Sequence, residues 1–222
     1  MAKIDLKAAD GHELGAYEVH PDGARAAVVI VQEIFGVNPH IRSVVDRYAA
    51  RGYHAVAPAI FDRAERGVEL EYTAEGVQEG IAIRGRIPWE ETMADVAAAV
   101  ERATATGPVA VVGYCFGGSV AWRAAHSLPV SAAVGYYGGA IAEFIDEDPK
   151  VPVMLHFGAD DQAIPLTIAE EVRERYPQVE VFVYEGAGHG FNCDARESYA
   201  PGAAALAQER TLDFLARAGV RP

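Results

Sequence analysis

A cysteine in a glycine-rich segment is the strongest chemical signal in the sequence. The apolar run Val109–Val112 leads through Gly113-Tyr114-Cys115-Phe116-Gly117 into a segment with helical spacing. In a Gly-x-nucleophile-x-Gly turn between a strand and a helix, the central side chain stands above the sheet and the glycines allow close backbone approach. A helix N-terminus favours a thiolate, and the amide of Phe116 can face a developing oxyanion. The segment therefore predicts a nucleophilic Cys115.

The same segment has two other interpretations. A buried structural cysteine beside a glycine-rich turn fits the local pattern about as well, because free cysteine is among the most buried residue types. A nucleotide-binding loop fits worse, since the segment has neither the glycine spacing of a dinucleotide loop nor the Lys-Ser/Thr of a P-loop. The residues that follow decide in favour of a nucleophile.

An acid and a histidine follow Cys115 in the order that α/β-hydrolases use. Asp160 and Asp161 come directly after the apolar run Val153–Phe157, and His189 lies between glycines after the run Val179–Tyr184. A thiol nucleophile needs a base to manage its proton and a carboxylate to fix the imidazole tautomer. We assign these roles to His189 and Asp161, while spacing within the loop leaves Asp160 open as the carboxylate.

The elements that must position these residues alternate between strand and helix. This pattern predicts a doubly wound, mostly parallel α/β sheet in a single domain over residues 1–222, with the three loops meeting at its carboxyl edge. Apolar runs typical of strands are Ala26–Val31, Tyr53–Ala57, Val109–Val112, Ala132–Tyr136, Val153–Phe157 and Val179–Tyr184. Helical spacing is found in Ile41–Arg51, Glu91–Ala105, Gly117–Ser127, Ile168–Arg175 and Ala203–Ala218.

The connection Phe61–Pro88 is less regular. It has several glycines, scattered charges and only weak helical spacing around Tyr72–Ile83. Because long irregular connections in α/β proteins often cover the site, we expect this segment to lie over the catalytic residues.

Composition and charge restrict the classes of partner. The 19 basic and 32 acidic residues give a net charge of -13, which repels phosphate backbones and anionic lipid surfaces. No run approaches the ~20 apolar residues of a membrane-spanning helix, and Met1–Lys7 lacks the features of a secretory signal. Two cysteines fit a reducing compartment. We therefore expect a cytoplasmic protein, a monomer or small homo-oligomer, without nucleic-acid or membrane partners.

Motifs along nearly the whole chain resemble those of the dienelactone hydrolase family of cysteine α/β-hydrolases. They are Val31–Gly36, Gly113–Gly118, Gly135–Gly138, the Asp161 loop, Gly188–Phe191 and Glu209–Phe214. The resemblance implies that Asp161, four residues before Pro165, is the acid. It also implies that Glu33 lies by the thiol and takes its proton when substrate binds, and that the Ile34 amide is a second oxyanion donor. No metal or organic cofactor is implied.

One departure from the family concerns the substrate. Members that cleave dienelactone hold its carboxylate with arginines, one of them four residues after the catalytic histidine, where this chain has Cys193. Arg84, Arg86 and Arg196 are the candidates to replace it. The expected activity is hydrolysis of a small lactone or ester, of the type that converts dienelactone to maleylacetate. The alternatives are a general carboxylesterase for neutral esters, or a non-catalytic ligand-binding or redox-sensing protein with Cys115 and Cys193 as an oxidisable pair.

Overall fold

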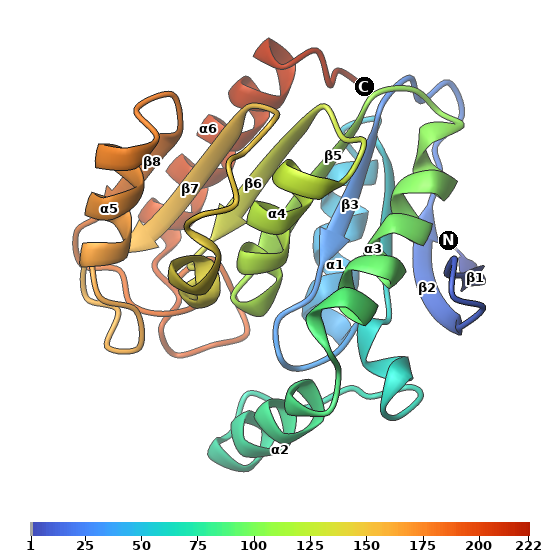
Figure 1. The fold of residues 1–222 in the computed structure, drawn as a ribbon, viewed down its shortest axis with the longest axis horizontal. Helices are drawn as coiled ribbons and strands as arrows, with labels where there is room; N and C mark the ends of the chain where they lie inside the picture. The colour runs from blue at the N-terminus through green and yellow to red at the C-terminus, as the bar shows by residue number, and fades with distance from the viewer. Residues whose placement is uncertain (1) are drawn as a thin grey trace.

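The fold is built on one eight-stranded sheet with the strand order β1-β2-β4-β3-β5-β6-β7-β8 (Figure 1). The computed structural model describes residues 2–222. The strands are β1 (Ala2–Lys7), β2 (Glu13–Val19), β3 (Ala27–Val31), β4 (His54–Pro58), β5 (Val109–Tyr114), β6 (Ala132–Tyr136), β7 (Val153–Gly158) and β8 (Glu180–Tyr184). Strands β1, β2 and β4 pair antiparallel, and all other pairs are parallel. The predicted mostly parallel α/β sheet is confirmed.

Helices cover both faces of this sheet, as Figure 1 shows for α3 and α4 on one face and α1 and α6 on the other. The α-helices are α1 (Pro39–Ala49), α2 (Ala74–Gly85), α3 (Trp89–Thr104), α4 (Phe116–Ser127), α5 (Thr167–Arg175) and α6 (Pro201–Arg217), with short 3₁₀ turns η1 (Ile60–Arg63) and η2 (Gly139–Phe144). Because both faces are covered, every residue of β3 and β5 is buried. Within residues 2–222, no helix is both long enough and apolar enough to cross a membrane.

Each strand and helix expected from the apolar runs is present, with ends that differ by a few residues. The N-terminal hairpin β1–β2 was not predicted. Only one face of β2 is fully buried, so its sequence contains no continuous apolar run. Helix α2 was only weakly indicated. Its buried positions are Gly76, Gly80 and Ile83, so that glycines take the place of the apolar side chains that create a helical period.

The connection between η1 and α3, which was expected to lie over the site, packs against the loop after β3 that carries Glu33 and Ile34. A Cβ atom at Gly80 of α2 would overlap the carbonyl of Ile34, which shows how closely this helix approaches the loop after β3. Gly36 of that loop forms a β-bridge with Glu69. The segment therefore contacts the loop that carries Glu33 at two positions, Ile34 and Gly36.

Candidate active site

Cys115 occupies a strained turn between β5 and α4. Its φ of 55° and ψ of -115° lie in a region that residues other than glycine rarely adopt, at a typical cost of about 1–3 kcal/mol. The surrounding contacts hold it there: the Cys115 amide donates to the Tyr136 carbonyl at 2.9 Å, and a Cβ at Gly113 would overlap the Gly117 carbonyl. The turn presents a half-buried thiol at the carboxyl edge of the sheet.

The start of α4 meets the loop after β3 next to this turn. The Gly117 amide donates to the Gln32 carbonyl at 3.1 Å, which joins the start of α4 to the loop after β3. Within residues 2–222, no acceptor is hydrogen-bonded to the amides of Ile34 or Phe116. These are the two donors expected for the oxyanion, and both remain available to a ligand.

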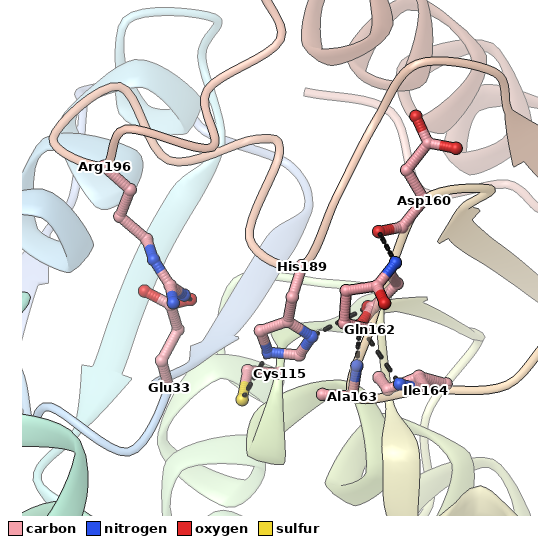
Figure 2. Close-up of polar contacts among 9 residues, drawn as sticks. Glu33, Cys115, Asp160, Gln162, Ala163, Ile164, His189 and Arg196 are labelled. Carbon is pink, nitrogen blue, oxygen red and sulfur yellow. Dashed lines mark hydrogen bonds and ion pairs between the residues drawn. The ribbon is translucent and has the colours of Figure 1, made fainter. Parts of the chain in front are cut away.

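Asp161, His189 and Cys115 form one hydrogen-bonded chain. His189 Nδ1 lies 2.8 Å from Asp161 Oδ2, and His189 Nε2 lies 3.3 Å from Cys115 Sγ (Figure 2). The Asp161 side chain is 1% exposed and the His189 side chain 22% exposed. The ring of Tyr137, which itself has a positive φ of 41°, packs edge-on against the His189 ring at 5.2 Å. The imidazole is thus fixed between the carboxylate and the thiol.

The charges of Asp161 and His189 stabilise each other. Burial alone would lower the pKa of His189, but the hydrogen bonds with Asp161 and then with Cys115 outweigh it and raise that pKa to about 10. Burial acts to raise the pKa of Asp161, yet the hydrogen bond with His189 and the amides of Ala163 and Ile164 bring it below its ordinary value. The arrangement therefore stabilises the imidazolium that forms when His189 accepts a proton beside an ionised Asp161.

The structure also distinguishes the two adjacent aspartates. Asp161 Oδ1 accepts from the amides of Ala163 at 2.8 Å and Ile164 at 3.1 Å, which turns Oδ2 toward His189. Asp160 is exposed, and Figure 2 shows its carboxylate directed away from His189. Asp161 is therefore the partner of His189.

Glu33 is buried, with a side chain 1% exposed, and its charge is paired with Arg196. Arg196 Nη1 lies 3.2 Å from Glu33 Oε1, and the hydroxyl of Tyr72 donates to Oε2 at 3.0 Å. The Arg196 side chain is 18% exposed and lies over the rings of Phe35 and Tyr72. The family resemblance predicts that Glu33 lies beside the thiol. In the structure, the two side-chain hydrogen bonds of Glu33 are made with Arg196 and Tyr72.

The other two arginines differ in position. Arg84 stacks on the rings of Trp89 at 4.3 Å and Phe116 at 4.9 Å, so its guanidinium lies beside the turn that carries Cys115. Burial lowers its pKa, partly offset by the charge of Glu143. Arg86 directly follows α2, is exposed and pairs with Glu65 at 3.6 Å. Of the two, only Arg84 reaches the residues around Cys115, because Trp89 and Phe116 provide a surface for its flat guanidinium.

Three residues near the site were not singled out from the sequence. Tyr72 bonds Glu33, Trp89 supports Arg84, and His40 lies close to Glu33 and Cys193. Tyr72 and Trp89 fall in or beside the irregular connection that was expected over the site, but nothing in their spacing marks either one. His40 lies at the start of α1, where a histidine has no distinguishing pattern. Both cysteines are free, and burial together with Glu33 raises the pKa of Cys193 to about 11.

Comparison with known proteins agrees with this architecture. The profile described as the dienelactone hydrolase family matches residues 14–219. Carboxymethylenebutenolidases from Pseudomonas putida and Pseudomonas knackmussii are each 36% identical over 224 residues, which cover 96% of this chain and 95% of theirs. A crystal structure from Klebsiella pneumoniae, provisionally described as a dienelactone hydrolase, has a TM-score of 0.84 and 30% identity, and the match covers 98% of this chain and 100% of that one. The chain therefore belongs to the dienelactone hydrolase family.

Proposed function

We propose that this protein hydrolyses small lactones or esters through a Cys115-His189-Asp161 triad and a covalent acyl-enzyme. Family membership identifies it as a hydrolase of carboxylic esters. The observation that carries the catalytic assignment is the continuous hydrogen-bonded chain of 2.8 Å and 3.3 Å from Asp161 through His189 to the thiol. This is the geometry that a nucleophile, its base and the group that orients the base require.

In the first half of the reaction, His189 Nε2 takes the proton of the Cys115 thiol. The thiolate attacks the carbonyl carbon, a C–S bond forms, and the carbonyl oxygen becomes an oxyanion that accepts from the amides of Ile34 and Phe116. When the tetrahedral intermediate collapses, the bond from the carbonyl carbon to the leaving oxygen breaks and His189 returns its proton to that oxygen. In a lactone the leaving oxygen stays attached to the acyl group.

In the second half, His189 removes a proton from a water molecule that attacks the thioester. A second oxyanion forms at the same two amides, the C–S bond breaks, and the thiolate regains its proton from His189 as the carboxylic acid leaves. Asp161 keeps the Nδ1 proton in place throughout, so that Nε2 alone accepts and donates.

The first candidate substrate is dienelactone, opened to maleylacetate. Relatives named carboxymethylenebutenolidase are similar over nearly the full length of both chains, which supports this choice. Arg84 beside Phe116 and Arg196 beside Glu33 are the groups we propose to attract the substrate carboxylate. A substrate carboxylate on Arg196 would compete with Glu33 for that guanidinium.

A specific observation keeps a second substrate class in view. Arg196 already pairs with Glu33, Arg84 lies flat on two aromatic rings, and the residue four positions after His189 is Cys193. If both arginines keep these partners during catalysis, the site will prefer a neutral ester.

The test is the loss of dienelactone absorbance with the wild-type protein, run beside Cys115→Ala and with a neutral aryl ester as the second substrate. Fast turnover of dienelactone that disappears in Cys115→Ala would support the full proposal. Cleavage of the aryl ester alone would move the substrate to the neutral class while retaining the triad. Equal activity of Cys115→Ala and wild type would refute the cysteine mechanism.

A further inference from the structure

Three buried side chains next to the triad offer metal-binding atoms to one another. One nitrogen of His40, one carboxylate oxygen of Glu33 and the sulfur of Cys193 all lie within 4.8 Å of one another. All three residues are buried, with exposed fractions of 0–5%. They come from the loop after β3, the start of α1 and the loop after His189, so no local sequence pattern indicates them. The catalytic mechanism proposed above uses neither His40 nor Cys193.

The two nitrogens of His40 are in unequal situations. Nδ1 lies 2.9 Å from Asp194 Oδ1, while Nε2 is buried with no hydrogen-bond partner. A buried polar nitrogen without a partner normally costs about 1–3 kcal/mol, so an orphaned Nε2 calls for an explanation. A carboxylate on Nδ1 fixes the tautomer in which Nε2 carries a free lone pair, and this carboxylate–histidine arrangement is the one that supports metal-ligating histidines.

We propose that Glu33, His40 and Cys193 form a binding site for a divalent cation of the zinc type. A thiolate, an imidazole and a carboxylate are the three ligand types that Zn²⁺ takes in proteins, and three protein ligands leave a fourth tetrahedral position open. Binding releases the thiol proton of Cys193, which leaves as a hydronium ion or to buffer. Asp194 belongs to the site as the group that holds His40 in place.

The carboxylate of Glu33 already accepts two hydrogen bonds. Glu33 Oε1 accepts from Arg196 and Oε2 from Tyr72, and a carboxylate has about four lone-pair positions, so a cation can share it with them. A cation and Arg196 would nevertheless compete for the same negative charge. Asp194, with a side chain 52% exposed, also lines a cavity of about 180 Å³ with Arg47 and Asn192.

Titration with Co²⁺ in place of Zn²⁺ tests the site directly, because a cobalt–thiolate bond gives a charge-transfer absorption band. We expect the metal-free protein to develop this band with one equivalent of Co²⁺ and to lose it when Zn²⁺ displaces the cobalt. The band should be retained in Cys115→Ser and lost in Cys193→Ser. This pair separates the proposed site from the catalytic Cys115 and His189, which also place a sulfur beside an imidazole, and it does not depend on hydrolysis.

A second variant avoids the buried residues altogether. Asp194 is exposed, and Asp194→Ala removes the carboxylate that is hydrogen-bonded to His40 Nδ1. This variant should bind Zn²⁺ about 10–100-fold more weakly in calorimetry. Glu197→Ala removes the same charge from the same loop and should leave the affinity unchanged. The proposal is overturned if wild type gives no thiolate band with Co²⁺, if the band is lost in Cys115→Ser but kept in Cys193→Ser, or if Asp194→Ala and Glu197→Ala bind Zn²⁺ equally well.

Discussion

Replacing Asp161 with asparagine should slow ester hydrolysis far more than the same change at Asp160. In Asp161 the two oxygens have separate partners: Oδ1 accepts from the amides of Ala163 and Ile164, and Oδ2 faces His189 Nδ1. An asparagine that keeps the two amide bonds must turn its NH₂ group toward His189. Nδ1 then becomes an acceptor, and the imidazole proton moves to Nε2, where it points at Cys115.

The size of the loss follows from these contacts. Loss of a hydrogen bond to a charged group costs about 1.5–3 kcal/mol, which corresponds to about 10–150-fold in rate. The wrong tautomer adds to this, because Nε2 can no longer accept the thiol proton, and the equivalent exchange in a serine protease lowers kcat by about 10⁴-fold. A thiol is a few per cent ionised at pH 7 without help, which limits the loss. We therefore expect kcat/KM to fall by about 10²–10⁴-fold at neutral pH.

The assay is kcat/KM for a neutral aryl ester as a function of pH, in wild type, Asp161→Asn and Asp160→Asn. The deficit of Asp161→Asn should shrink as the pH rises, since hydroxide can then remove the thiol proton in place of His189. Asp160 is exposed and makes no contact with His189, so Asp160→Asn should stay within about twofold of wild type. Equal activities of the two variants, or a larger loss in Asp160→Asn, would refute the assignment of Asp161.

Three other variants test neighbouring parts of the site. Arg84→Met keeps the packing of the aliphatic part of the side chain and should raise KM for a carboxylate-bearing lactone by about tenfold or more. KM for a neutral ester should not change, and the control variant Arg86→Met should change neither value. Equal changes for both substrates in Arg84→Met would exclude a role in carboxylate binding. Glu33→Gln leaves a largely buried Arg196 charge unpaired, so urea unfolding should show a loss of about 3–5 kcal/mol. Glu69→Gln, in a pair whose side chains are 25% and 38% exposed, should cost about 1 kcal/mol or less. Cys115→Gly relieves the positive φ that Cys115→Ala retains, so its Tm should be higher by at least about 2–4 °C; equal Tm values would argue against strain in the turn.

The sequence was most informative where local pattern determines structure. The apolar runs before Cys115, Asp161 and His189 are parallel strands, of which β5 and β7 are buried and β8 is mostly half-buried. A parallel sheet brings their carboxyl ends to one edge, so the sequence alone could place the three loops together. The choice between Asp160 and Asp161 depended on the conformation of one turn. Two adjacent residues point in different directions there, and local spacing carries no information on which one faces His189.

Long-range contacts were the harder part to predict. Glu33 and Arg196 are 163 positions apart in the chain, and neither has a neighbour pattern that distinguishes a buried pair from two surface charges. The buried glycine face of α2 raised the same difficulty, because a close backbone contact leaves no apolar signal in the sequence. In both cases a contact with a segment distant in the sequence determines the role of the residue: Arg196 for Glu33, and the Ile34 backbone for Gly80.

The arginine expected four residues after His189 is absent from that position, but a guanidinium still reaches the site from further along the chain. The Cys193 amide donates to the Gly190 carbonyl and the Arg196 amide to the Cys193 carbonyl, so two successive turns carry the backbone to Arg196. Gly190 has a φ of 75°, and a Cβ there would lie 2.5 Å from Arg196 Nη1. The guanidinium therefore passes over Gly190 because that residue has no side chain, and from there it reaches Glu33. The turn thus places an arginine three residues beyond Cys193, where its guanidinium pairs with Glu33.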